Sequence, residues 1–372
     1  MFESVPAALR LTIDGDALAA NWRWLRARGG EAACGAAVKA DGYGLGARGV
    51  VDRLAREGCR DFFVSSWAEA AALGPMPEGV ALSVLHGVRE ADMPAALSGI
   101  ARPVLNSAEQ VARWKAAGGA ACDVMIDTGI NRLGLRPEEA GVLAGLEIET
   151  LMSHLACADE PDHPMNERQL ARFRQVRAAI PAKRYSLANS AGICLGKKYA
   201  FGVTRPGLAL YGGIPVIGHS VQEQGLRPVA AVETEVIQIR QVEAGETVGY
   251  GATWQAHHPT KVAILNVGYA DGILRQFAEH LPIRVGDQVF GMIGRISMDL
   301  IAVDVTDHDH VVITEHDGEG WTSHKRLRTP ANVREGDWLT LPLHLPWLSR
   351  STTLSQYELL TTLGHRYQRR WT

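Results

Sequence analysis

A lysine followed at once by a glycine-rich turn is the residue with the clearest chemical potential in this chain. Lys39 closes the short apolar run 36–40 and precedes the turn Asp41-Gly42-Tyr43-Gly44. An amine at the end of a strand stands where catalytic groups lie in strand-helix folds. Burial there would lower its pKa and free its lone pair to attack a carbonyl, as in a Schiff base with pyridoxal phosphate (PLP). A solvated lysine with no chemical role is the alternative.

Further polar groups stand at or beside the ends of predicted strands. They are Arg132 in the segment 127–132, His154, the pair Asn189-Ser190, and Arg205. Catalytic residues of a β/α barrel lie at the carboxyl ends of its strands. With Lys39, these make five such positions on one rim, which indicates a site.

Each of these groups also has a plain structural explanation. Ser190, with Gly192 and Gly207, could present backbone N–H groups to a phosphate, or Ser190 could be a routine helix cap. His154 could be a hydrogen-bonded core histidine, and Arg205 could be half of a structural salt bridge. The interpretation as a site therefore depends on all of them together.

The elements that must position these groups alternate between short apolar runs and helix-period segments. The segments 16–28, 107–117 and 163–180 are predicted helices, with Asp16 and Ser107 as N-caps. Eight strand-helix repeats predict a (β/α)8 barrel of the TIM type, with a doubly wound open sheet as the alternative. The eight predicted strands are 36–40, 62–66, 83–86, 103–106, 124–127, 150–155, 185–188 and 208–211.

The pattern changes after about residue 225, where the apolar residues alternate and many are β-branched. The segments 229–242, 261–267, 282–290 and 301–304 are predicted strands, and glycine turns separate them. We therefore expect a barrel domain over residues 1–225 and a mainly β domain over residues 226–372.

Composition excludes several classes of protein. The 372 residues carry a formal net charge of −3 with mixed signs, so nothing indicates binding to nucleic acid or a membrane surface. The five cysteines are scattered, which favours reduced thiols in a cytoplasmic protein. We see no signal peptide and no apolar run long enough to span a bilayer.

The second half adds a tyrosine in a glycine-rich turn, Gly249-Tyr250-Gly251, which alone would be an ordinary surface or packing tyrosine. With the other motifs, however, the chain resembles alanine racemases over residues 11–366. The motifs that carry the resemblance are residues 37–44, 127–134, 153–158, 205–207, 249–251, 268–272, 298–299 and 357–358. Their order along one chain is specific, whereas any one of them would be modest.

The resemblance implies a PLP enzyme that racemises alanine with two bases. Lys39 would hold PLP and act as one base, and Tyr250 would act on the opposite face of the substrate. Arg205 would face the pyridine nitrogen, with His154 between Arg205 and Tyr250. Arg132 would face the phenolic oxygen of PLP and the substrate carboxylate.

The resemblance also implies the rest of the site. Met298 would offer a backbone N–H to the substrate carboxylate, with Tyr269 and Asp299 close by. The phosphate would be lined by Tyr43, Asn189, Ser190, Gly207, Leu208 and Tyr357. In this family Tyr250, Tyr269 and Met298 reach into the partner subunit's site, so we expect a homodimer with composite sites. No metal is expected.

The sequence departs from the family pattern at three places. Family members often carry a carbamylated lysine where Met125 stands, so we expect Arg132 to be positioned by a bound anion or by Asn131. Residues 307–330 form a histidine-containing insertion, which is expected to be a solvated loop rather than a metal site. Residues 341–354, which lead to Tyr357, are expected to be short and poor in helix.

Rival functions are a racemase for serine or broader substrates, a PLP-dependent decarboxylase and a PLP carrier without catalysis. A decarboxylase would be expected to carry an acidic group at the position of Arg205. A carrier would have no use for Tyr250 and Met298. We therefore expect interconversion of L- and D-alanine, which supplies D-alanine for peptidoglycan.

Overall fold

The computed structural model describes residues 7–219, 225–278, 280–286, 288–306, 310–313, 324–327 and 332–372. The chain forms two compact units. We call residues 16–219 and 225–227 the barrel unit, and we call the described residues of 7–15 and 228–372 the β unit. Each is described by itself.

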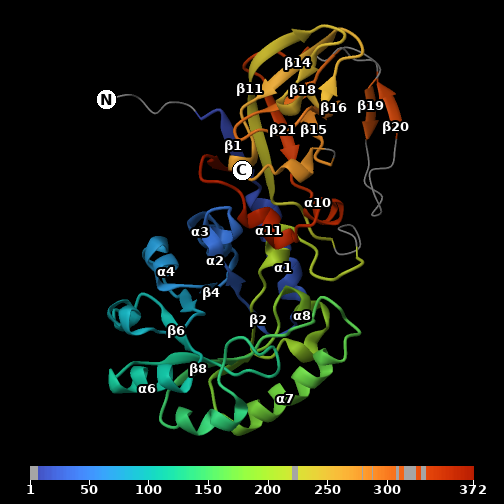
Figure 1. The fold of residues 1–372 in the computed structure, drawn as a ribbon. Coiled ribbons are helices and arrows are strands. Elements are labelled where there is room, and N and C mark those ends of the chain that lie inside the picture. The colour runs from blue at the N-terminus through green and yellow to red at the C-terminus, as the bar shows by residue number, and fades with distance from the viewer. Residues whose placement is uncertain are drawn as a thin grey trace. The chain divides into compact units, whose positions relative to one another are not determined.

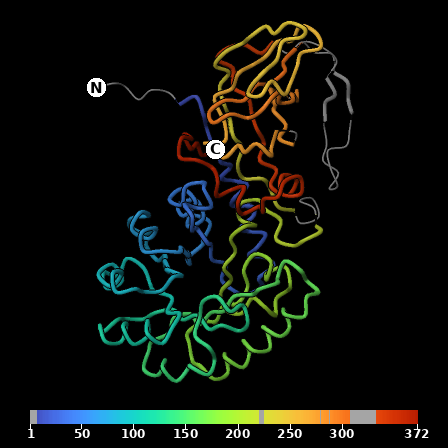
Figure 2. The backbone as a smooth tube through the Cα atoms, viewed as in Figure 1, coloured from blue at the N-terminus to red at the C-terminus, as the bar shows by residue number. Residues whose placement is uncertain are grey.

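The barrel unit is built on a curled sheet of seven parallel strands in sequence order. Helices lie along its outside, and the backbone passes from strand to helix in order around the unit (Figures 1 and 2). This sheet confirms seven of the eight predicted barrel strands and, with the separate β unit, the predicted fold class. The strands are β3 (Ala36–Ala37), β4 (Asp61–Val64), β5 (Ala81–Val84), β6 (Arg102–Leu105), β7 (Cys122–Met125), β8 (Ile148–Met152) and β9 (Arg184–Ser186).

The eighth predicted strand, residues 208–211, is wrong. Leu208–Tyr211 forms a 3-10 turn, and the extended segment is the earlier β10 (Val203–Thr204), which pairs in parallel with β2 (Ala33–Cys34). The four residues 208–211 are fully buried. A short buried apolar run does not distinguish a strand from a buried helical turn, which is why the pattern misled.

The three predicted helices are confirmed, with small shifts at their ends. Ser107 caps its helix as predicted, because its side chain accepts a hydrogen bond from Gln110 N at 3.3 Å. Asp16 lies inside the first turn of its helix rather than at the cap. The helices of this unit include α1 (Gly15–Arg28), α3 (Ala47–Glu57), α4 (Trp67–Leu73), α5 (Met93–Leu97), α6 (Ala108–Ala116), α7 (Met165–Ala179) and α8 (Ser190–Cys194).

The β unit is organised around the long strand β11 (Ala230–Val242), which pairs antiparallel with β14 (Thr260–Leu265) on one part of its length and β21 (Trp338–Pro342) on another. The sheet continues through β15 (Ile283–Val285), β16 (Gln288–Phe290), β17 (Met292–Ile293) and β18 (Ile301–Asp304). Strand β1 (Leu9–Ile13) pairs antiparallel with β11 and parallel with β22 (Gln368–Trp371). The N-terminal segment, which sequence patterns placed with the barrel, therefore shares a sheet with strands from the other end of the chain (Figure 1).

Residues 341–354 are not poor in helix, contrary to the expectation. Helix α10 (Leu345–Ser351) precedes α11 (Gln356–Thr361), and Leu345, Leu348 and Leu360 of these helices are buried. The histidine-containing insertion lies outside the described residues apart from the paired strands β19 (His310–Ile313) and β20 (His324–Leu327). No helix in the described ranges is both long and apolar enough to cross a membrane.

Candidate active site

Lys39 stands directly beyond β3, at the start of a turn with unusual backbone geometry. Ala40, Asp41 and Tyr43 have φ angles of 51°, 52° and 56°, in the left-handed region that costs energy for residues with a side chain. Two carboxylates hold this turn: Asp41 Oδ1 accepts from Ala47 N at 2.8 Å, and Glu69 Oε1 accepts from Ala40 N at 2.8 Å.

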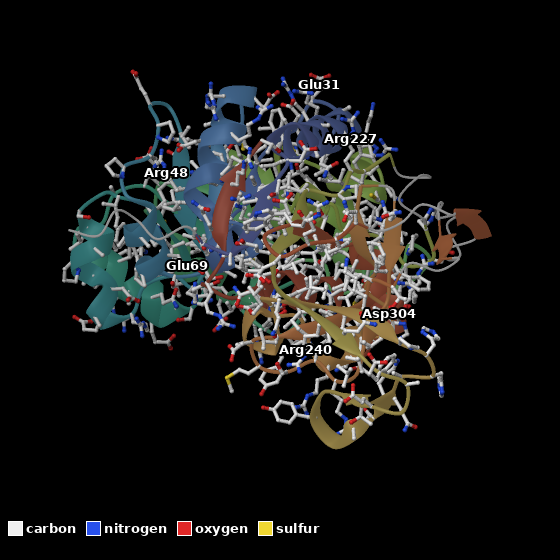
Figure 3. The ribbon with its side chains drawn as sticks, turned by 90° about the horizontal axis from the view of Figure 1, so that it is seen from above. Glu31, Arg48, Glu69, Arg227, Arg240 and Asp304 are labelled. Carbon is white, nitrogen blue, oxygen red and sulfur yellow. The ribbon has the colours of Figure 1, made fainter. Side chains whose placement is uncertain are left out.

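Glu69, labelled in Figure 3, also ties this turn to the next loop. Its Oε2 accepts from Ser65 N at 2.6 Å and from Ser66 N at 3.3 Å, so one side chain fastens the ends of β3 and β4. Local sequence patterns show Glu69 only as the third residue of a capping box. They therefore missed its contact with the lysine turn.

The electrostatic surroundings of Lys39 favour a neutral amine. Burial lowers the pKa of Lys39, the positive charge of Arg132 lowers it further, and Glu69 partly opposes them. A lowered pKa increases the fraction of neutral amine near pH 7, and the neutral amine is the nucleophile. The chemical interpretation of Lys39 is therefore favoured over that of a solvated lysine.

His154, directly after β8, is surrounded by positive charge. Burial lowers its pKa to about 3, and Arg205, Arg132 and Lys39 lower it in that order of importance. The imidazole is therefore neutral at physiological pH. Because all three cations act on this one ring, the structure brings together Lys39, Arg132, His154 and Arg205, as the rim argument predicted.

Arg205 is buried and held by two fixed acceptors. Its guanidinium donates from Nη1 to Ser186 Oγ and from Nη2 to the carbonyl oxygen of Ser153. Burial lowers the pKa of Arg205 to about 10, while the carboxylate of Asp123 raises it. Arg205 therefore remains charged at neutral pH, without a carboxylate within salt-bridge distance among the described residues.

The predicted phosphate ligands of the barrel unit form one cradle. Ser190 Oγ accepts from Gly207 N at 2.9 Å and from Ala209 N at 3.3 Å, and Asn189 caps α8 by accepting from Gly192 N at 2.8 Å. A Cβ atom on Gly207 would lie 2.1 Å from the Tyr43 hydroxyl, so only glycine fits there. Leu208 is buried beside this turn.

These residues fit PLP on two grounds. The first ground is that Lys39, Arg132 and Arg205 form a cluster of cations. Glu69, the carboxylate that acts on Lys39, already accepts hydrogen bonds from backbone N–H groups. Such a cluster favours a bound polyanion. The cradle supplies the second ground, because a loop and a helix N-terminus meet at a glycine without room for a side chain.

Gln169 is a further organising residue that the sequence interpretation missed. It is fully buried on α7; its Nε2 donates to the carbonyl oxygen of His154 at 2.9 Å, and its Oε1 accepts from Ala156 N at 2.9 Å. Its Nε2 also lies 3.4 Å from Thr128 Oγ1, which joins the loops after β7 and β8. The sequence signal that could have indicated this residue is its position beside Leu170 and Phe173, which places a glutamine on the buried face of an amphipathic helix.

Met125 packs in the barrel interior against Phe63, Val104 and Met152. Asn131 has a left-handed backbone (φ 54°). The exposed Arg132 side chain makes no hydrogen bond or ion pair with any described residue, Asn131 included. This leaves the bound anion as the proposal for what positions Arg132.

Tyr250 lies at the tip of a hairpin in the β unit. Strands β12 (Thr247–Val248) and β13 (Trp254–Gln255) pair on either side of the turn Tyr250–Ala252. A Cβ atom on Gly294 would lie 2.6 Å from Val248 O, so this hairpin packs closely on the neighbouring loop. The Tyr250 side chain itself is 70% exposed.

Two more loops of the β unit carry the predicted substrate contacts. Tyr269 N donates to Ser297 O and Ala270 N donates to Met298 O, each at 3.0 Å. Met298 is 53% exposed, and Tyr357 on α11 is 47% exposed. Tyr269, Met298 and Asp299 are thus brought together, whereas the approach of these residues, Tyr250 and Tyr357 to the barrel rim stays a prediction.

Comparison with known proteins matches both halves of the chain. Residues 13–215 match the alanine racemase N-terminal domain, and residues 229–371 match the alanine racemase C-terminal domain. Alanine racemase of Cereibacter sphaeroides is 40% identical over 380 residues, covering 98% of each chain, and that of Rhizobium meliloti is 38% identical, covering 99% of this chain and 97% of the relative.

Solved structures show the same likeness. The structure of alanine racemase from Bartonella henselae with covalently bound pyridoxal phosphate has a TM-score of 0.81 at 32% identity, covering 99% of this chain and 100% of that one. Biosynthetic alanine racemase from Pseudomonas aeruginosa has a TM-score of 0.81 at 31% identity, with the same coverage.

Proposed function

The chain belongs to the alanine racemase family, and we propose that it interconverts L- and D-alanine with PLP by a two-base mechanism. Lys39 and Tyr250 are the proposed bases. The observation that carries this proposal is the Lys39 amine, whose pKa is lowered by burial and by Arg132, beside a cradle suited to phosphate.

PLP, when bound, withdraws electrons from the substrate α-carbon and so acidifies the α-proton. Lys39 is proposed to hold it, and Arg132 to face its phenolic oxygen. The phosphate is proposed to be lined by Tyr43, Asn189, Ser190, Gly207, Leu208 and Tyr357. For the barrel residues, the cradle described above supports this assignment.

Racemisation needs a base on each face of the substrate. One base removes the α-proton and the other returns a proton to the opposite face, so the substrate need not turn over. A free tyrosine has a pKa near 10, so a tyrosine that acts as a base near pH 7 needs neighbours that favour the phenolate. Arg205, acting through His154, is proposed to do this for Tyr250, because a nearby cation favours the phenolate.

Arg205 is proposed to face the pyridine nitrogen. With a pKa of about 10 it keeps its proton at pH 7 and does not readily give it up to the ring nitrogen. The ring nitrogen therefore stays unprotonated, which weakens electron withdrawal and limits side reactions such as transamination.

The active unit is proposed to be a homodimer. Tyr250, Tyr269 and Met298 would complete the partner subunit's site, with Met298 N–H on the substrate carboxylate and Asp299 close by. The exposure of Tyr250 and Met298 supports this, since a working base must be shielded from water. We also propose that the reaction supplies D-alanine for peptidoglycan from the cytoplasm, where thiols such as the five unpaired cysteines stay reduced.

Chiral chromatography of L-alanine incubated with the purified protein and PLP tests the proposal. The wild type should bring L- and D-alanine to an equal mixture. Lys39→Ala should lose at least about a thousandfold in rate, because one base and the attachment of PLP are removed together. Lys183→Ala, which removes an exposed lysine paired with Glu147 and Glu149, should keep the wild-type rate.

A folded, PLP-loaded wild type that produces no D-alanine would overturn the assignment of substrate. Serine and bulkier amino acids would then be assayed in the same way. An active Lys39→Ala variant would instead overturn the two-base mechanism.

A further inference from the structure

One arginine of the β unit joins the two loops that carry the proposed substrate contacts. Arg366 donates from Nε to Asp271 Oδ1 at 2.7 Å and from Nη2 to Asp271 Oδ2 at 2.8 Å. Its remaining Nη1 donates to Asp299 Oδ1 at 2.7 Å. A single planar guanidinium thus fixes two carboxylates relative to each other.

The two carboxylates belong to different loops. Asp271 is buried, and its Oδ2 also accepts from Gly268 N at 3.0 Å, so it organises the loop that contains Tyr269. Asp299 directly follows Met298 and is half-exposed. Arg366 therefore holds the Tyr269 loop and the Met298 loop together.

The backbones of these loops already lie against each other. A Cβ atom on Gly268 would lie 2.4 Å from Met298 O, which leaves room for glycine alone. This contact and the two backbone hydrogen bonds fix the spacing of the loops. Arg366 then fixes the direction in which the Asp299 side chain points.

That direction matters for a substrate with a carboxylate. The Met298 N–H donates to no atom of the described residues, so it is available to a ligand. A substrate carboxylate placed there would lie one residue from Asp299, and like charges at such separations repel. Pairing with Arg366 offsets the negative charge of Asp299.

We propose that Arg366 is a positioning residue for the substrate carboxylate. Asp299 pairs with Arg366 and is not a direct ligand of the substrate. This inference rests on the proposed function, since it assigns how the Met298 N–H is kept open for alanine. It predicts that freeing Asp299 from Arg366 weakens carboxylate binding more than it slows proton transfer.

Loss of Arg366 should leave the backbone of the Asp271 loop in place. Tyr367 donates from its hydroxyl to Asp271 O at 2.7 Å, and Gly364 N donates to the same oxygen at 3.3 Å. The Asp271 backbone is thus held without the arginine. Arg366→Lys serves as a second variant, because lysine keeps the charge beside buried Asp271 but cannot bond both carboxylates in a fork.

The experiment compares holoenzymes of the wild type, Arg366→Ala, Arg366→Lys, Asp299→Asn and the double variant Arg366→Ala/Asp299→Asn. Arg370→Ala is the control, because Arg370 is exposed on β22 close by in sequence. The readouts are KM and kcat for both alanine enantiomers, and the Kd of propionate by calorimetry. Propionate has the carbon chain and carboxylate of alanine without its amine.

Arg366→Ala should raise KM and the propionate Kd about tenfold, with kcat within about threefold, and Arg366→Lys should show the same pattern more weakly. Asp299→Asn alone should raise KM and the propionate Kd less than Arg366→Ala does, because asparagine still accepts from Arg366. The double variant should recover much of the loss, because it removes the released charge. A purely structural role predicts no such recovery.

Unchanged KM and Kd in both arginine variants would overturn the inference, as would a double variant that binds propionate no better than Arg366→Ala. A tenfold rise of KM in Asp299→Asn would show that Asp299 contacts the substrate directly. An inactive wild type would instead overturn the proposed function.

Discussion

In the barrel unit, burial shifts the pKa values of His154 and Arg205, whereas Tyr250 and Met298 of the β unit are exposed to solvent. Arg205 is buried, and His154 is held neutral with a pKa of about 3. Tyr250 and Met298 are 70% and 53% exposed. The protonation of these barrel groups is thus set within one chain, while the β unit presents its groups on exposed turns.

This difference shows where each part of the chemistry is set. Burial and neighbouring charges fix the protonation of the barrel groups before any ligand arrives. Tyr250 is exposed, so under the proposed function its activation would come from the partner subunit that it meets. The predictions below test this contrast.

Among changes in the β unit, removal of the Tyr250 hydroxyl should produce the largest effect. Tyr250→Phe should lower racemisation about a thousandfold, with the L-to-D direction affected most, because the base for one face is lost. Exchange of the D-alanine α-proton in D₂O, followed by NMR, should persist, because Lys39 still serves the other face. Tyr185→Phe, which removes a hydroxyl bonded to Ile180 O, is the control. Equal loss of exchange and racemisation would assign both steps to Tyr250.

Mixing two inactive variants tests whether the β unit works on a partner. Lys39→Ala and Tyr250→Phe chains, dissociated and reassembled together, should regain about a quarter of the wild-type rate. Half of the dimers would be mixed, and each would contain one site with both bases. No recovery, although mixed dimers are seen by mass spectrometry of differently tagged chains, would show that each chain uses its own tyrosine.

The smallest predicted effect is a change in acid stability. The pKa of His154 is about 3 in the fold, against an ordinary value of 6.5. Between these values the unfolded chain binds a proton that the folded chain does not, so stability falls as pH falls, by about 1 kcal/mol per unit from this group. His154→Asn should remove that component.

Denaturation midpoints measured from pH 7 to pH 4.5 check this. As the pH falls, the denaturation midpoint of His154→Asn should increase relative to that of the wild type. His86→Asn, which removes an exposed histidine of the same unit, should follow the wild type. Parallel curves for all three proteins would mean that the charge state of His154 is not set by the fold.

Much of the barrel could be predicted because its signals are local. Buried strands appear as short apolar runs, and the rule that catalytic groups follow strands singled out Lys39 and His154 as candidates, whereas Arg205 was predicted to precede the eighth strand. The failure at residues 208–211 has the same origin, because a buried helical turn has the same apolar composition as a strand. The preceding Pro206-Gly207 was a turn signal that the apolar run outweighed.

Contacts between distant segments could not be predicted from local pattern. Arg366 meets Asp271 across 95 positions, and Glu69 meets Ala40 across 29. A lone charged residue on a helix or near a strand is compatible with many partners. The placement of β1 beside β11 and β22 was missed for the same reason, because pairing depends on register and not on composition.

The position of β1 between β11 and β22 also has a consequence for synthesis of the chain on the ribosome. Because β1 precedes both of its partners in the chain, it must wait, unpaired, until residues 230–242 and then 368–371 have emerged. The barrel strands β3 to β9 are complete long before then, and domains generally fold as units during synthesis. The barrel unit therefore folds while the β unit still lacks its partners, and the edge of β1 is the segment most exposed to misassembly in the interval.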